Sequence, residues 1–430
     1  MAKSESQSQI FLSLLLIAPF FLAGCSDQAE NLDATSVTVF EGARFIVGDG
    51  SDPIEDGALV IQADRVIQIG GRGEIEVPQG AVWVDLTGKT VMPAIINSHM
   101  HLAATRDELV GQLEHNAYYG VGSVLSLGLD VSEVNLQIRN ELIPNAARYR
   151  TAWRGITRPE PGRTEVPYWV NTESEARAAV EDLAAKKPDF VKIWVDDRSG
   201  QFPKMTPELY GAVIDGAHDQ GLKVGAHIFA LEDAKGLLRA GVDMFAHGVR
   251  DRDIDDEFVA LVQERPQTVL VPNLGDRGVA TDLSWLGQTV PAAQLSQMQA
   301  DATDRPAVQA SYAIQARNLK RLVGAGMTIG HGSDGRNPWA PHLEMEDMVA
   351  AGMTPAQVIV AATRNSAELI GLTDVGTIQP GKIADFVVLD ANPLDDITNT
   401  RRIDAVYLRG VPVDRAAVSA RLLGGSTATP

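Results

Sequence analysis

The chain of 430 residues is poor in cysteine and short of basic charge. Its one cysteine, Cys25, excludes an intrachain disulfide as a source of stability. Lys and Arg number 37 against 56 Asp and Glu, so the formal net charge is -19 at pH 7. Nucleic acids are bound through basic patches, and anionic lipid surfaces also attract basic segments. The charge balance therefore argues against a nucleic-acid partner and against electrostatic docking on a membrane.

The cysteine closes an apolar stretch near the N-terminus. Residues 9–24 read QIFLSLLLIAPFFLAG and are followed directly by Cys25. A run of this length suits the core of a signal peptide better than a membrane span. The segment LAGC resembles the lipobox of bacterial lipoproteins, in which the cysteine is lipidated and becomes the mature N-terminus. We expect a signal peptide over 1–25 and a polar tether over 26–36, with a plain secretory signal and a chance cysteine as the alternative.

The resemblance to lipoprotein signals has a consequence for location. It implies that the protein is exported and anchored by lipid in the bacterial cell envelope, at the outer membrane where the organism has one. The lipid would be its only attachment to the membrane.

Two stretches of predicted short strands flank a long central region in which the pattern of apolar residues is different. Residues 37–92 and 372–430 show short alternating runs bounded by Gly and Asp turns. Over 93–371, apolar strand-like runs alternate with amphipathic helical stretches, a pattern typical of a parallel β/α barrel. The sequence therefore predicts an α/β protein in which 93–371 form a (β/α)8 TIM barrel. The two flanking segments would pair with each other into a small β-sandwich.

Two histidines mark the end of the first predicted barrel strand. His99 and His101 stand in INSHMHL, and their spacing puts both side chains on one face of a strand. At this end of a barrel strand that face points into the mouth, where barrel active sites lie. Imidazoles in an apolar wall are costly unless a partner satisfies them, and a zinc ion does so by binding the neutral ring nitrogen. An ordinary hydrogen-bonded pair of core histidines is the alternative.

Four later runs each carry one further polar group. Lys192 lies in DFVKIWV, His227 in VGAHIFA, His247 in MFAHGV, and Asp334 at the end of TIGHGSD. Each has an ordinary explanation, such as an ion pair, a hydrogen-bonded core histidine or a helix cap. Together with the first pair, they place polar groups at the same end of five strands. That coincidence predicts a metal centre.

These motifs resemble those of the amidohydrolase superfamily, and most closely its imidazolonepropionase-like and prolidase-like branch. The matching segments are VMPAIINSHMHL, FVKIWV, VGAHI, FAHGV and GSDG, followed by TPAQVIVAATRNSAELIGL and GTIQPGKIADFVVLDANPLDDI. The resemblance covers residues 37 to about 415. Ala94 and Asn97 stand where many relatives have Gly and Asp, and His331 is not part of the usual motif. The sequence does not show whether His331 faces the pocket.

The resemblance implies a site with two divalent metal ions, for which zinc is the expected metal. The first pair of histidines would bind one ion with Asp334, and His227 and His247 would bind the other. Lys192, carboxylated by carbon dioxide, would bridge both ions as a carbamate, together with a hydroxide. Asp334 would accept the proton of the attacking water and pass it to the leaving amine. The implied activity is hydrolysis of an amide or peptide C–N bond in a small-molecule substrate.

Other functions remain open at this stage. The same centre could hydrolyse a carbamate, a lactone, a cyclic amide or an aryl amide. A non-catalytic lipoprotein that uses a barrel for binding is the alternative from another class, and a complete ligand set argues against it. The loops after the strands suggest four residues that could contact substrate, and these are Arg154, Tyr168, Arg198 and His342. An arginine that faces the pocket could bind a substrate carboxylate. The sequence names neither the substrate nor the oligomeric state, and a homo-oligomer remains open.

Overall fold

The computed structural model describes residues 37–424. The predicted signal peptide, with Cys25, and the predicted tether lie outside the described residues. Between residues 37 and 424, no helix combines the length and the hydropathy that crossing a membrane requires.

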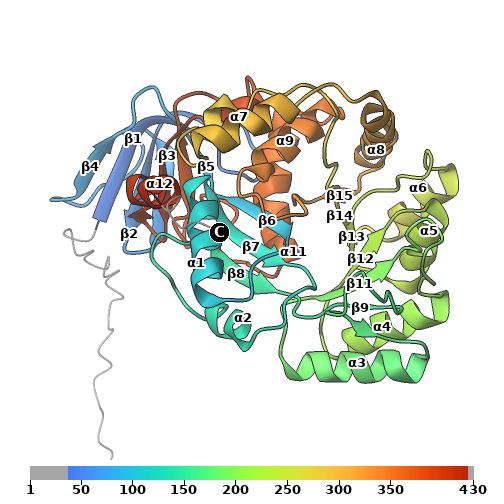
Figure 1. The fold of residues 1–430 in the computed structure, drawn as a ribbon. Helices are drawn as coiled ribbons and strands as arrows, with labels where there is room; N and C mark the ends of the chain where they lie inside the picture. The colour runs from blue at the N-terminus through green and yellow to red at the C-terminus, as the bar shows by residue number, and fades with distance from the viewer. Residues whose placement is uncertain (1–36, 425–430) are drawn as a thin grey trace, which may run out of the picture. The chain divides into compact units, whose positions relative to one another are not determined.

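Strands from both ends of the described chain pair into one eight-stranded sheet (Figure 1). Its strands are β1 (Val37–Phe45), β2 (Ile54–Gln62), β3 (Arg65–Gly71), β4 (Val82–Asp85), β5 (Thr90–Pro93), β16 (Phe386–Leu389), β17 (Ile403–Leu408) and β18 (Val411–Pro412). Their order is β18-β17-β16-β5-β1-β2-β3, and β4 pairs with β1 off this path. The junction is the antiparallel pair of β5 with β16, in which Thr90 faces Leu389. The two ends of the chain therefore pair as expected, whereas their arrangement as a sandwich stays a prediction.

The central region forms two parallel sheets. The smaller has the order β6-β7-β8, and the larger has the order β10-β9-β11-β12-β13-β14-β15. The strands are β6 (Ile95–Met100), β7 (Val121–Ser126), β8 (Arg148–Thr151), β9 (Ile156–Thr157), β10 (Tyr168–Trp169), β11 (Val191–Val195), β12 (Val224–Ile228), β13 (Met244–Ala246), β14 (Val269–Val271) and β15 (Thr328–Ile329). Every residue of β11 to β14 is buried, as expected for parallel strands covered on both faces.

Helices follow most of these parallel strands, and Figure 1 shows α3 to α6 packed outside β11 to β14. The longer helices are α1 (Arg106–Tyr118), α3 (Glu173–Ala185), α4 (Pro207–Asp219), α5 (Leu231–Ala240), α6 (Asp256–Glu264), α7 (Ala292–Asp301), α8 (Pro306–Gly324), α9 (Ala340–Ala350) and α12 (Arg415–Gly424). Shorter ones are α2 (Glu133–Ile138), η2 (Ser284–Leu286), α10 (Pro355–Val360), the π-helical η3 (Ala361–Asn365), α11 (Ser366–Leu369) and η4 (Ile397–Arg401). The core lies between strands and helices, where Ile193 of β11 and Val213 of α4 belong to one fully buried apolar cluster.

Backbone hydrogen bonds join the first parallel strand to the segment after the last one. Ser98 N donates to His331 O over 2.9 Å, and Asp334 N donates to His99 O over 2.9 Å. The smaller sheet also approaches the larger one, because Gly155 N donates to Gly128 O over 2.8 Å. The carboxyl ends of β6 and β15 therefore lie side by side, and residues that follow these strands can meet.

Candidate metal centre

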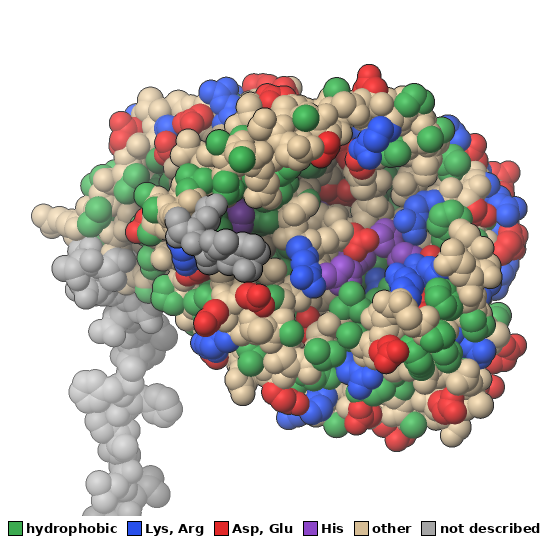
Figure 2. Space-filling model, in the orientation of Figure 1, with side chains coloured by type: hydrophobic (Ala, Val, Ile, Leu, Met, Phe, Trp, Pro, Cys, Tyr) green, Lys and Arg blue, Asp and Glu red, His purple; other side chains and the backbone are tan. Residues whose placement is uncertain are grey.

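The structure brings together polar side chains from five parallel strands. They lie in or within five residues after β6, β11, β12, β13 and β15, and are His99, His101, Lys192, His227, His247 and Asp334. Histidine side chains of this group lie at the bottom of a hollow in the face shown in Figure 2. The convergence arises because the carboxyl ends of parallel strands meet at one edge.

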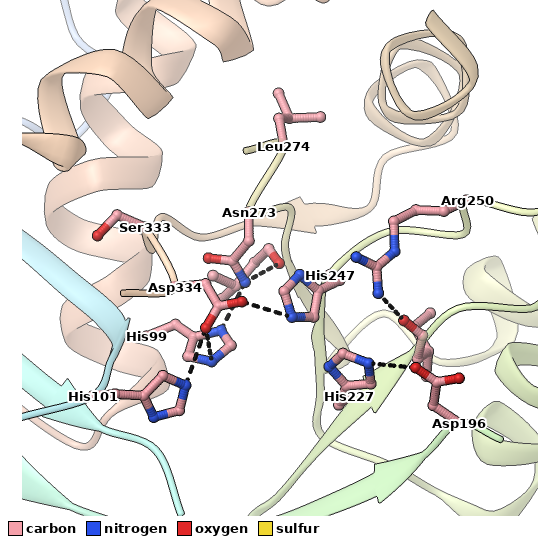
Figure 3. A network of polar contacts seen from close by, with 12 residues as sticks. His99, His101, Asp196, His227, His247, Arg250, Asn273, Leu274, Ser333 and Asp334 are labelled. Atoms are coloured by element: carbon pink, nitrogen blue, oxygen red, sulfur yellow. Dashed lines mark hydrogen bonds and ion pairs between the residues drawn. The ribbon is translucent and has the colours of Figure 1, made fainter. Parts of the chain in front are cut away.

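Asp334 stands at the centre of three imidazoles (Figure 3). Its Oδ1 lies 3.0 Å from His101 Nε2 and 3.3 Å from His99 Nε2, and its Oδ2 lies 3.3 Å from His247 Nε2. Burial by itself raises the pKa of this carboxyl. The three surrounding histidines lower the pKa by a larger amount, so the net pKa lies well below its usual range. Asp334 is therefore an anion that faces three ring nitrogens.

Three histidines of this cluster, His99, His227 and His247, are neutral. Burial disfavours a charged ring, so it lowers the pKa of His99 and His247 well below the usual value and lowers the pKa of His227 to about 3. Ligand atoms of His99, His247 and Asp334 lie within 4.8 Å of one another. Neutral imidazole nitrogens beside a carboxylate are a donor set that suits a divalent ion such as zinc.

Lys192 adds a buried amine whose one recorded contact in the described part of the chain is the ring of Trp194, 5.4 Å from Nζ to the ring centroid. Its side chain is 1% exposed, and its Nζ has no hydrogen-bond partner among the described residues. Burial lowers the pKa of this amine to about 7. A buried polar atom without a partner is costly, so the group fits a site at which the amine is modified or neutralised by a ligand.

The cluster opens into a cavity of about 360 Å³. Arg163 and Thr164 stand in its wall, together with the apolar side chains of Leu129 and Trp194. The full set of lining residues is His99, His101, Leu129, Arg163, Thr164, Trp194, His227, His247 and Asp334. The volume is large enough for a small organic substrate rather than a folded protein.

A model of the amidohydrolase family matches residues 161–413, which is more than half of the chain. The chain belongs to the amidohydrolase family. Membership confirms the predicted enzyme class, a hydrolase that acts on carbon–nitrogen bonds. The superfamily has a TIM-barrel fold, which agrees with the α/β class and the parallel sheets found here.

Individual relatives cover almost the whole described chain. Imidazolonepropionase of Streptomyces griseus is 27% identical over 384 residues, which are 84% of this chain and 90% of that protein. The crystal structure of a Bifidobacterium longum protein is 27% identical, with a TM-score of 0.73 over 91% of this chain and 99% of that one. A crystal structure of a Xaa-Pro dipeptidase with bound methionine is 23% identical, with a TM-score of 0.70 over 88% of this chain and 99% of that one. The likeness to the dipeptidase concerns the fold.

Two residues of this amidohydrolase that the sequence reading missed contact the histidines. Asp196 Oδ2 lies 3.0 Å from His227 Nε2, and the amide of Asn273 lies 2.8 Å from His99 Nδ1. Asp196 stands four positions after Lys192, on the same face of an extended chain, which is a signal that could have identified it. Asn273 follows β14 of the larger sheet, a strand for which the sequence predicted no site residue.

Three of the four predicted substrate contacts lie elsewhere, which corrects that prediction. The guanidinium of Arg154 stacks 4.0 Å over the ring of Tyr168 at a separate cavity, and the Tyr168 hydroxyl donates to Asp182. His342 is fully buried, with Nδ1 3.0 Å from Thr400 Oγ1 and Nε2 2.9 Å from Tyr119 O. A loop position does not show where a side chain points, because long-range packing decides it.

Arg198 and His331 have distinct places. Arg198, the fourth predicted contact, lies beside the cluster, with Nη1 3.0 Å from His227 Nε2. His331 is buried between backbone carbonyls, with Nδ1 3.1 Å from Ile96 O and Nε2 3.1 Å from Pro341 O. His331 therefore supports the backbone behind the site and does not face the cavity.

Proposed function

We propose that this chain is a metal-dependent amidohydrolase that cleaves an amide or peptide bond of a small-molecule substrate. The observation that carries this proposal is the contact of Asp334 with three imidazoles beside the amine of Lys192, which has no hydrogen-bond partner among the described residues. A carboxylate and histidines in a cavity beside a buried amine provide both ligands for metal and a base for proton transfer.

The site would hold two divalent ions, with zinc expected. His99, His101 and Asp334 would bind one, and His227 and His247 would bind the other. Support comes from the neutral rings and from the close approach of the His227 and His247 ring centroids, 4.6 Å apart. When bound, such ions lower the pKa of a coordinated water and polarise the scissile carbonyl.

Lys192 would complete the centre as a carbamate. The neutral amine adds to carbon dioxide, so an N–C bond forms and one proton is released. The product is an anion that replaces a costly buried cation. We expect Lys192→Ala to lose bound metal and to regain part of it with added short carboxylic acids, as measured by elemental analysis after gel filtration. Full metal content in Lys192→Ala without such an acid contradicts the carbamate.

Asp334 would act as the proton carrier. Its carboxylate is part of the cavity wall, so it can accept the proton of the attacking water and deliver it to the leaving amine. The neighbouring histidines orient both carboxylate oxygens. Leu129 and Trp194 add apolar surface to the cavity wall beside this carboxylate.

The substrate class follows from the wall of the cavity. Arg163 is a cation at its rim that can bind a carboxylate, which favours dipeptides or N-acyl amino acids. A dipeptidase and an imidazolonepropionase among the similar proteins agree with an amide substrate. The alternative substrates are carbamates, lactones, cyclic amides and aryl amides, and the apolar wall of Leu129 and Trp194 would suit an aryl group.

The deciding experiment is a substrate screen with the purified, zinc-loaded protein. Dipeptides, N-acyl amino acids, carbamates and aryl amides are each tested with and without a chelator. We expect turnover of an amide that the chelator abolishes and zinc restores. A protein that binds no divalent ion after loading would contradict the proposal.

We also propose the finer architecture and location. The two parallel sheets would close into one (β/α)8 barrel over 93–371, with 37–92 and 372–430 forming a β-sandwich. The bonds from Ser98 N to His331 O and from Gly155 N to Gly128 O support closure.

Lipid attachment at Cys25 rests on the LAGC segment alone. Metabolic labelling with palmitate tests it, because label in the parent protein should be lost in Cys25→Ser.

A further inference from the structure

His227 is oriented differently from the other histidines of the cluster. His99, His101 and His247 each turn Nε2 toward Asp334, within 3.0 to 3.3 Å. His227 turns its Nε2 toward Asp196, and Figure 3 shows its other ring nitrogen on the side of the ring away from Asp196. The nitrogen available to the centre is therefore Nδ1.

Asp196 is held in place from two sides. Its Oδ2 accepts a hydrogen bond from Arg198 Nη1 over 2.7 Å, and its Oδ1 accepts one from the backbone N of Arg198 over 2.9 Å. Arg198 is fixed in turn because its Nε donates to Glu160 Oε1 over 3.2 Å, and Glu160 is itself buried. The carboxylate of Asp196 therefore cannot easily rotate away from His227.

The contacts decide which ring nitrogen carries the hydrogen. A neutral imidazole has one N–H, and Nε2 lies 3.0 Å from both Asp196 Oδ2 and Arg198 Nη1. If Nε2 carried the lone pair, that lone pair would face an anionic oxygen at 3.0 Å. If Nε2 carries the hydrogen, the imidazole and the guanidinium both donate to the same carboxylate oxygen. The second arrangement is favoured because the anion accepts both hydrogens.

We infer that Asp196 is a positioning residue that holds His227 in the Nε2-protonated tautomer and so presents the Nδ1 lone pair to the metal centre. This inference rests on the proposed function, because it assigns the nitrogen with which His227 binds metal. Arg198 and Glu160 act through Asp196, so Arg198 is committed to this carboxylate rather than to a substrate. Outer carboxylates of this kind fix the ring and the tautomer of a ligand histidine.

Nitrogen-15 NMR of the histidine rings tests the inference without measuring activity. The purified full chain, labelled at its eight histidines, is compared before and after zinc loading, and His227→Gln assigns the His227 signals. We expect Nε2 of His227 to be protonated before zinc is added, and Nδ1 to be the nitrogen whose shift changes on zinc binding. A proton on Nδ1 in the zinc-free parent protein would overturn the inference, whatever the protein catalyses.

Variants extend the test to affinity. Asp196→Ala should mix the two tautomers of His227 and weaken zinc binding by about 10- to 100-fold in competition with a chromophoric chelator. Asp197→Ala is the matched control, because Asp197 carries the same charge in the same loop and accepts from Gly200 N. Equal zinc affinity of Asp196→Ala and Asp197→Ala would contradict the inference.

The design separates this inference from the proposed function. If the parent protein binds no zinc, the proposed function fails, and the tautomer of His227 in the zinc-free protein still decides the role of Asp196. If Asp196→Ala does not fold, the nitrogen-15 spectrum of the parent protein still shows which ring nitrogen of His227 carries the hydrogen.

Discussion

The aliphatic stem of Lys192 packs directly against the backbone of Gly128. A Cβ built on Gly128 would lie 2.7 Å from Lys192 Cγ, and Gly128 has φ +94. Gly128, two positions after the end of β7, therefore limits where the side chain of Lys192 in β11 can lie.

Replacement of this glycine should disturb Lys192. Gly128→Ala adds a methyl group that clashes with the lysine stem, and it forces alanine into the left-handed region at a cost of about 1–2 kcal/mol. We expect a lower melting temperature and a loss of bound zinc, measured by calorimetry and elemental analysis. Gly221→Ala is the control, because Gly221 has a similar φ of +70 but open space around it. Apart from its two chain neighbours, no heavy atom of the described residues lies within 4 Å of a Cβ added there. Loss of zinc in both variants would mean that contact with Lys192 is not the cause.

Asp334→Asn should separate proton transfer from metal binding. The amide keeps an oxygen beside the histidines but cannot accept the proton, so we expect kcat to fall by about 100- to 10,000-fold. Metal content should remain substantial, because His99, His101 and His247 are unchanged. Normal turnover in this variant, measured on the substrate found in the screen, would rule out the proposed proton carrier.

Arg163→Met should affect recognition of carboxylates. Arg163 lines the cavity and pairs with Glu160, but it is partly exposed, so we expect KM to rise by roughly five- to tenfold for substrates with a free carboxylate. Analogues with an amidated carboxylate should show no change. Arg154→Met is the matched control, because Arg154 stacks on Tyr168 at the separate cavity. A comparable change in both variants would remove Arg163 from the recognition of substrate.

Glu344 should make stability depend on pH. This buried residue of α9 accepts a hydrogen bond from Leu274 N over 3.0 Å, and burial raises its pKa from the ordinary 4.5 to about 8. The folded protein therefore retains a proton that the unfolded chain releases between these values, and stability falls as pH rises through that window. Glu344→Gln, which stays neutral, should gain melting temperature relative to the parent at pH 8.5 but not at pH 4.5.

Thermal denaturation across pH 4.5 to 8.5 measures this difference. Glu368→Gln, a change of an exposed carboxylate on α11, is the control for the removal of one carboxylate. A difference in melting temperature between Glu344→Gln and the parent that stays constant from pH 4.5 to 8.5 would show that Glu344 does not titrate in this range.

Much of the candidate site could be predicted because strand alternation is a local property. The spacing of His99 and His101 puts both on one face, and Lys192 in an apolar run of strand length has to be buried. The α/β class, with strands and helices that alternate over the central region, follows from periodicity in the same way. These features depend only on neighbouring residues, so the sequence alone is enough to determine them.

The surroundings of those residues depend on the tertiary structure. The orientation of His227 toward Asp196, the contact of Asn273 with His99, and the burial of His342 away from the cavity all join residues distant in the chain. Tyr168 and Arg154 were misplaced for the same reason, since a loop residue follows whichever partner the packing brings near it. By itself the sequence identified side chains that the fold brings together at one edge of the parallel strands. Only the fold decided which atoms of those side chains face one another, because that depends on packing between segments far apart in the chain.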